Sequence, residues 1–265
     1  MTLKVNTETL TDLKDIADSF NHYFASVFTS ENLTHLLNFP QVFRTENLTQ
    51  ISTTPIQVGK LLRELNANKS CGPDDIHPRI LKHCSYSLAS PLCTLFNTSF
   101  KCGEIPDDWK TANVIPLYKK GAKDKVANYR PVSLTSIASK ICEKIVRKSI
   151  VNFWTDHQVL IGRAIRFYMK KRSCLSQLLD TFHSWAKARN DSHKVDVMLP
   201  DFTKAFGSVP HQRLLAKLKG YGIGGNLLNW LTHFIVGRKQ RVLFCGHFSP
   251  WTMVTCGLPQ GSVLG

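Results

Sequence analysis

The stretch ANVIPLYKKGAKDKVANYRPVS, residues 112–133, decides the fold class. Residues 112–118 alternate in character and include β-branched side chains, and the chain then enters a basic turn. A second strand-like pattern follows at residues 129–133. Such runs, separated by turn residues, are typical of β-strands. We therefore predict two strands in the middle of a chain whose other segments are mostly helical in pattern.

Helical periodicity flanks this stretch on both sides. Residues 78–101 carry a helical pattern that ends before a glycine, and residues 137–153 carry another. Further helical patterns cover residues 13–27, 55–65, 173–188, 209–221 and 230–237, and strand-like runs cover 195–199, 240–245 and 251–256. Helices and strands are mixed without a regular βαβ alternation, so the sequence predicts an α+β fold.

The charge of the chain favours a polyanionic partner. Its 265 residues are 43% hydrophobic, which suits a globular protein, and its formal net charge is +15. A surface this basic attracts phosphate backbones. Nucleic acid is the leading interpretation, and an acidic membrane surface or solubility alone are the alternatives. No apolar run approaches the roughly 20 residues that span a bilayer, and the acidic N-terminus does not resemble a signal peptide, so we expect an intracellular protein without a membrane partner.

The basic residues are concentrated in one region. Residues 110–172 contain fifteen lysines and arginines and three acidic residues, whereas residues 1–50 contain three basic and six acidic ones. A charge run usually marks a solvated face, but one this uneven favours the wall of a groove that follows a phosphate backbone. The helix predicted over residues 13–27 should instead pack on the main body.

One carboxylate follows a predicted strand, at a position where it could bind a metal ion. The apolar run at residues 195–199 predicts a buried strand, and Asp201 follows its end. A carboxylate at the mouth of a sheet can hold Mg²⁺, the ion that two-metal phosphoryl transfer requires. Taken alone this signal is weak, because an aspartate after a strand more often caps the next helix.

Six motifs in order strengthen the interpretation. They are KSCGPDDIHP (69–78), WKTA (109–112), IPLYKKG (115–121), NYRPVSL (128–134), DFTKAFGSV (201–209) and GLPQGSVLG (257–265). Together they resemble the reverse transcriptase domains of retrotransposons that lack long terminal repeats, and the match is closest to the jockey-like branch. The resemblance covers roughly residues 56–265.

The resemblance implies a right-hand polymerase fold. Residues 1–55 would form an N-terminal helical extension or linker, residues 56–190 a fingers-like region, and residues 191–265 a partial palm. The implied function is that of an RNA-directed DNA polymerase, which uses Mg²⁺, an RNA template, a DNA primer and deoxynucleoside triphosphates. The sequence gives no indication of protein partners.

The resemblance also implies roles for individual residues. Asp201 matches the metal-binding aspartate of the first palm motif, with the carbonyl oxygen of Phe202 as a second ligand for the same metal. Phe206 matches the aromatic residue under the incoming sugar, where it would exclude a 2′-OH, and Gln260 matches a glutamine near the same sugar. A plain core role for Phe206 is the alternative.

The remaining contacts that the resemblance implies are made by basic side chains and by the backbone of a glycine. Arg130 matches the arginine of the fingers that binds the triphosphate through its planar set of donors, and Lys119 or Lys120 would add a point charge. Gly261 would allow the template to approach the backbone closely. The template would also be held by the basic residues Lys170, Lys171 and Arg172.

The chain as given lacks part of the family pattern. It ends at Gly265, before the later palm motif with two adjacent aspartates. We therefore expect this chain alone not to extend a primer, because a single carboxylate cannot assemble the two-metal site. Two rival functions remain. One is a catalytically inactive nucleic-acid-binding relic. The other is a maturase-like splicing cofactor, which is disfavoured because the sequence contains no maturase or DNA-binding segment.

Overall fold

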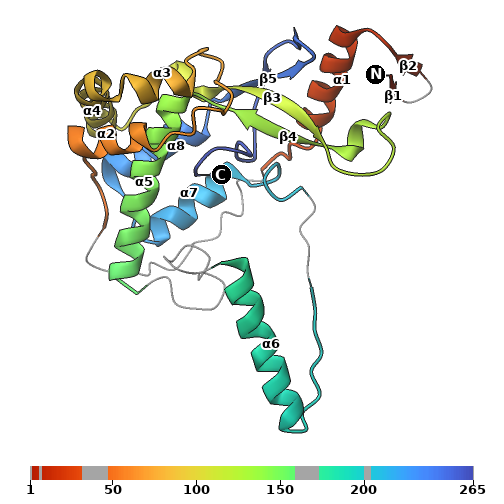
Figure 1. The fold of residues 1–265 in the computed structure, drawn as a ribbon, viewed down its shortest axis with the longest axis vertical. Helices are drawn as coiled ribbons and strands as arrows, with labels where there is room; N and C mark the ends of the chain where they lie inside the picture. The colour runs from red at the N-terminus through yellow and green to blue at the C-terminus, as the bar shows by residue number, and fades with distance from the viewer. Residues whose placement is uncertain (1, 6–7, 32–46, 159–172, 200–203, 265) are drawn as a thin grey trace. The chain divides into compact units, whose positions relative to one another are not determined.

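The computed structural model describes residues 2–5, 8–31, 47–158, 173–199 and 204–264 (Figure 1). It divides into two compact units, one made of residues 1–149 and 204–265 and the other of residues 150–203. The first unit brings together segments far apart in the sequence and contains the β-sheets. Mixed helices and sheets confirm the predicted α+β class.

A five-stranded sheet forms the centre of the first unit (Figure 1). β3 (Thr111–Tyr118) pairs antiparallel with β4 (Tyr129–Leu134), as the opening stretch of sequence predicts, and parallel with β5 (Lys239–Phe244). β5 also pairs antiparallel with the short strands β6 (His247–Phe248) and β7 (Thr252–Met253). The parallel pairing brings the end of the chain beside its middle.

Helix α1 (Leu13–Ala25) covers one face of this sheet. Asp12 caps the helix by accepting hydrogen bonds from two backbone N–H groups of the first turn. The ring of Phe20 is fully buried and packs against Tyr129 of β4 and Phe244 of β5. The core of this face consists of Leu3, Ile16, Ala17, Phe20, Phe24, Val114, Tyr129 and Val242. The expectation that this helix packs on the main body is therefore confirmed.

A helical layer adjoins the sheet. It contains α2 (Pro55–Arg63), α3 (Pro78–His83), α4 (Ser85–Cys102) and α8 (Gly225–Ile235), with α4 packed on both α2 and α8. The indole of the buried Trp230 donates a hydrogen bond to Ser99 Oγ and packs edge-on against Phe100. The prediction of a single helix over residues 78–101 is wrong in one respect. The helix is interrupted at Cys84, which is the C-cap of α3 and the N-cap of α4.

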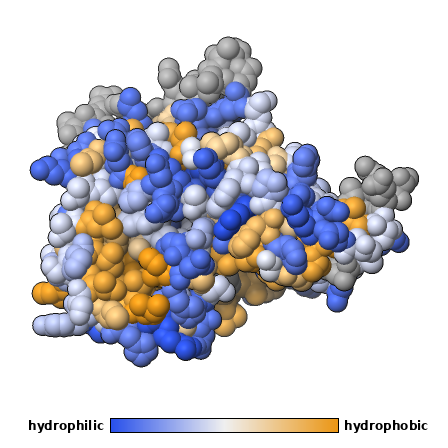
Figure 2. Space-filling view, turned by 90° about the horizontal axis from the view of Figure 1, so that it is seen from above, coloured by the Kyte–Doolittle hydropathy of each residue, from blue (hydrophilic) through white to orange (hydrophobic). Residues whose placement is uncertain are grey.

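The other elements of the first unit are short. They are β1 (Leu3–Val5), β2 (Glu8–Leu10), the 3-10 turns η2 (Asp107–Lys110) and η3 (Val126–Asn128), and α7 (His211–Gly220). Apolar side chains also reach the surface, as the orange patches among blue residues in Figure 2 show. Within the described part of the chain, no helix has the length and apolar character needed to cross a bilayer.

The second unit contains the end of α5 (Ile137–Asp156) and the helix α6 (Cys174–Asn190). The buried strand predicted at residues 195–199 is wrong: these residues form no strand, and Met198 and Leu199 are almost fully exposed. A strand requires a neighbour for its backbone hydrogen bonds, and none of the described strands pairs with this run.

Candidate nucleotide site

Three of the sequence motifs meet through backbone hydrogen bonds. Leu258 N donates to Phe206 O at 2.8 Å, and Gly257 N donates to Val209 O at 2.8 Å, so the end of the 201–209 motif lies beside the start of the 257–265 motif. Ser133 N of β4 donates to Gln260 O at 2.7 Å. The 257–261 segment therefore connects the turn at Phe206 with the strand that carries Arg130.

Two glycines make this close approach possible. Gly257 has φ +82°, and a Cβ there would lie 2.7 Å from Phe206 O and 2.8 Å from Gly207 Cα. Gly261 has φ +109°, and a Cβ there would lie 3.0 Å from Ser133 O. Residues with side chains are strained at such angles. The crossing of the three segments thus depends on glycine at both positions.

A buried glutamate holds the far end of the same loop. Glu143 on α5 is fully buried, and its Oε2 accepts hydrogen bonds from Val263 N at 2.7 Å and Leu264 N at 3.2 Å. Its other oxygen accepts from Ser139 Oγ at 3.3 Å. Burial raises the pKa of this carboxyl group, while the loop N–H groups and the charge of Arg238 oppose the rise. Glu143 therefore fixes the loop to α5.

Arg238 supplies a buried positive charge near Glu143. Burial lowers its pKa to about 10, and the carboxylate of Glu143 partly offsets that shift. Its Nη1 donates to Phe234 O at 2.9 Å, and its guanidinium lies over the ring of Phe234. The backbone of Arg238 in turn accepts from Val254 N at 2.9 Å. The loop and the end of α8 thus share one buried polar cluster.

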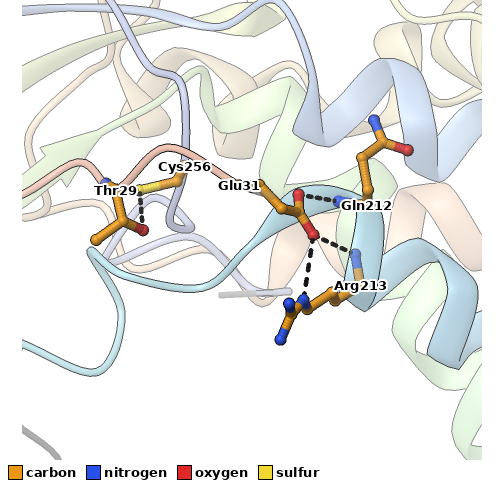
Figure 3. A network of polar contacts seen from close by, with 5 residues as sticks. All are labelled: Thr29, Glu31, Gln212, Arg213 and Cys256. Carbon is orange, nitrogen blue, oxygen red and sulfur yellow. Dashed lines mark hydrogen bonds and ion pairs between the residues drawn. The ribbon is translucent and has the colours of Figure 1, made fainter. Parts of the chain in front are cut away.

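The N-terminal segment also contacts this region (Figure 3). The two carboxylate oxygens of Glu31 accept hydrogen bonds from Gln212 N and Arg213 N, each at 3.0 Å, in the first turn of α7. Pro210, which precedes α7, offers no side-chain cap. Thr29 N donates to Cys256 Sγ at 3.1 Å, beside Gly257. Residues 29–31 therefore supply the missing cap and contact the start of the loop.

Residues 118–265, more than half of the chain, match the family model described as reverse transcriptase (RNA-dependent DNA polymerase). The chain belongs to the reverse transcriptase family. It is 25% identical over 221 residues to the probable RNA-directed DNA polymerase from transposon BS of Drosophila melanogaster, covering 80% of this chain and 24% of that protein.

Two further relatives are RNA-directed DNA polymerases from the mobile element jockey. The Drosophila melanogaster protein is 27% identical, covering 79% of this chain and 23% of that protein. The Drosophila funebris protein is 28% identical, with the same two shares. These matches confirm the resemblance to jockey-like reverse transcriptases. The chain spans about a quarter of the length of these curated relatives.

The structure brings together part of the site expected for a reverse transcriptase. Leu258, two residues before Gln260, donates its backbone N–H to Phe206 O, and Gln260 O accepts a hydrogen bond from Ser133 N of β4. Phe206 is 45% exposed. Arg130 is exposed on β4, three residues before Ser133. Gly261 follows Gln260 and touches the same strand.

The two lysines lie further out on the hairpin. Lys119 and Lys120 are exposed just after β3, where Lys119 N donates to Asn128 O at 2.8 Å. Arg130 pairs across the strands with Leu117, between these lysines and the loop. Among the described residues, neither lysine nor Arg130 forms an ion pair with a carboxylate. Their charges are thus available to a ligand.

Five predicted site residues lie outside the described part of the chain. They are Asp201 and Phe202, expected at the metal, and Lys170, Lys171 and Arg172, expected at the template. Among the residues that are described, no group of three His, Cys, Asp or Glu side chains could hold a metal ion. The metal and template roles of these five residues remain predictions.

Glu143 was missed as a site residue, although the sequence contains a signal for it. The buried residues Ser139, Val146 and Ile150 lie at i−4, i+3 and i+7 from Glu143, so the glutamate occupies the apolar stripe of its helix. An acidic residue in that register needs a buried partner. Its actual partners, the N–H groups of Val263 and Leu264, are 120 and 121 residues further along the chain.

Proposed function

We propose that the chain supplies the fingers and part of the palm of an RNA-directed DNA polymerase of a retrotransposon without long terminal repeats. In this proposal residues 56–190 are the fingers-like region, residues 191–265 the partial palm, and residues 1–55 a helical extension. The observation that carries it is the hydrogen-bonded crossing of the 206–209, 257–261 and β4 segments. Three motifs that the family places around a nucleotide thereby meet in one place.

The incoming nucleotide would lie along this crossing. Arg130 is an exposed guanidinium without a carboxylate partner among the described residues, so its donors are free for a triphosphate. Lys119 and Lys120, at the end of β3, would add positive charge for the same triphosphate. Phe206 would lie under the sugar and exclude a 2′-OH, and Gln260 would approach the sugar from the neighbouring segment.

Catalysis would need Mg²⁺. The carboxylate of Asp201 and the carbonyl oxygen of Phe202 are hard oxygen donors of the kind that Mg²⁺ prefers. Bound there, Mg²⁺ would stabilise the negative charge that develops on the transferring phosphate. Asp201 would hold the ion, while Arg130 would orient the triphosphate. An RNA template and a DNA primer would be the other substrates, with Gly261, Lys170, Lys171 and Arg172 on the template.

The first test measures triphosphate binding. We expect Arg130→Gln to weaken the affinity for dTTP, with oligo(dT) annealed to poly(rA) and Mg²⁺ present, by about tenfold to a hundredfold. Hydrogen bonds to charged groups contribute roughly 1.5–3 kcal/mol. The matched control is Arg79→Gln, which removes an exposed arginine from α3. Equal affinities for the Arg130 variant, the control and the unaltered chain would contradict the proposal.

The second test measures polymerisation. A version of the chain that continues through the later palm motif with its two aspartates should extend the primer, and Asp201→Ala in that version should abolish extension. The chain of 265 residues alone should bind without extending. Extension that survives Asp201→Ala would contradict the assigned metal ligand, and binding without extension in the longer version would favour the inactive relic.

A further inference from the structure

An arginine on β5 lies over two aromatic rings. The guanidinium carbon of Arg241 lies 3.8 Å from the ring centre of Phe248 and 4.5 Å from that of Trp251. Its Nε donates to Oδ1 of the buried Asn113 at 2.9 Å. Within the described residues, its two terminal nitrogens have no hydrogen-bond or ion-pair partner. The cation is thus fixed in place while its outer donors stay unused.

The register of the sheet puts this cluster on the same face as Arg130. Cross-strand partners point to the same side, and successive residues point to opposite sides. Arg241 is the partner of Asn113, and Phe248 is the partner of Leu243. Arg130 is the partner of Leu117, an even number of residues from Asn113. Helix α1 covers the other face, where Phe20 meets Tyr129 and Phe244.

Part of this second face is exposed to solvent, and the charges on its strands are all positive. The side chains of Leu117, Phe248 and Trp251 are 42–43% exposed. The strands β3 to β7 contain no aspartate or glutamate, and they carry Arg130, Lys239 and Arg241. Partly exposed aromatic rings beside cations without an ion-pair partner suit a single-stranded nucleic acid, whose bases stack on aromatic rings and whose phosphates bind arginine. A duplex keeps the faces of its bases stacked inside.

We propose that Arg241, Phe248 and Trp251 form a stacking platform for unpaired bases of the template strand. The platform rests on the proposed function, because Arg130 on the same face is taken as the triphosphate ligand. The template would cross the open face of the sheet from this platform toward Arg130 and the 257–261 loop. Phe248 and Trp251 would stack with bases, and Arg241 would contact a phosphate.

The test compares two labelled strands of about twelve nucleotides by fluorescence anisotropy. One strand is oligothymidine, and the other has the same backbone but lacks its central bases. The chain should bind the strand with bases about fivefold to a hundredfold more tightly, the range expected when one base stacks on an aromatic side chain. Replacing both rings, Phe248→Leu with Trp251→Leu, should reduce that ratio at least threefold. Arg241→Gln should weaken binding of both strands and leave the ratio unchanged.

Two controls separate a binding role from a structural one. Tyr86→Leu removes an aromatic ring from α4 that is 93% exposed, and it should leave the ratio unchanged. The melting temperature of each variant shows whether it is folded, and Phe248→Leu alone carries the test if the double variant does not fold. A ratio near one for the unaltered chain, or an undiminished ratio in folded ring variants, would overturn the platform.

Failure of the platform is distinguishable from failure of the proposed function. Undiminished base preference in the ring variants, together with loss of dTTP binding in Arg130→Gln, would overturn the platform and leave the nucleotide site standing. Loss of base preference in the ring variants, with dTTP binding unaffected by Arg130→Gln, would support the platform and contradict the triphosphate ligand.

Discussion

The charges behind the 257–264 loop are buried and hydrogen-bonded, whereas the charges on the exposed sheet face have no carboxylate partner among the described residues. Glu143 and Arg238 are almost completely buried, and Glu143 accepts three hydrogen bonds. Arg130 is exposed and without a carboxylate partner among the described residues, and Arg241 is held by rings that leave its outer donors free. The buried charges therefore shape the site, whereas the exposed cations are available to a ligand.

This difference predicts which measurement each substitution changes. A buried charged group needs its partners, because an unsatisfied polar group in the interior is costly. An exposed cation has little effect on stability, because solvent screens it. Substitutions behind the loop should therefore reduce stability, and substitutions on the face should reduce binding while stability is kept.

The largest effect is expected for Glu143→Ala. It leaves the N–H groups of Val263 and Leu264 and the charge of Arg238 without their partner, so the free energy of unfolding should fall by about 3–5 kcal/mol. Urea denaturation measures the change. Glu64→Ala, at an exposed glutamate that ends α2, should change it by less than about 0.5 kcal/mol. Similar losses for the two variants would break the comparison.

A smaller loss is expected for Gly257→Ala. The new Cβ would meet backbone atoms of Phe206 and Gly207 at 2.7–2.8 Å, in addition to the strain of a positive φ, so we expect a loss of about 2–3 kcal/mol. Gly246→Ala is the matched control, because its φ is +84° and no atom lies within 4 Å of the new Cβ. It should cost about 1 kcal/mol. Equal losses in thermal melts would show that the close approach is unimportant.

A change of pH should alter the stability of the chain through Glu143, by less than the Glu143→Ala substitution does. Burial raises the pKa of this carboxyl group above its ordinary value of 4.5, so the folded state binds its proton more tightly than the unfolded state. The stability that Glu143 contributes is therefore complete below that value and decreases as the pH rises through the raised pKa. As the pH rises from that ordinary value through the raised pKa, the melting temperature of the unaltered chain should fall relative to that of Glu143→Gln. A constant difference would contradict the raised pKa.

The cap that Glu31 provides for α7 should contribute still less to the free energy of unfolding. Glu31→Gln keeps one acceptor but removes the negative charge at the helix N-terminus and the ion pair with Arg213, whose Nε lies 3.8 Å from the carboxylate. We expect a loss of about 1 kcal/mol, which should shrink in high salt. Urea denaturation at low and high salt measures both values. A loss that is independent of salt would mean that charge is not the cause.

The smallest change in stability is expected for Arg130→Gln. This side chain is exposed and has no carboxylate partner among the described residues, so the free energy of unfolding should change by less than about 0.5 kcal/mol. Binding of dTTP should weaken nevertheless. A loss of stability above 1 kcal/mol would assign Arg130 to the buried, structural class and contradict the comparison.

The sequence by itself determined the local elements and the family. The alternation in residues 112–118 and the turn after it predict β3 and β4, and the helical patterns predict α1, α2, α5 and α7, because these signals depend on neighbouring residues. The motif order identifies the reverse transcriptase family, which the matches confirm. Local signals failed where the chain needed a distant partner, as at residues 195–199.

Only the tertiary structure decided which segments meet. The parallel pairing of β3 with β5 and the hydrogen bond from Ser133 to Gln260 join parts of the chain more than 120 residues apart. Glu143 could be recognised as misplaced on an apolar stripe, but its partners at Val263 and Leu264 could not. The stack on Arg241 likewise needs the register of β5 with β3 and β6. Such contacts depend on how the whole chain buries its apolar faces and satisfies its polar groups, and no short window of sequence contains that information.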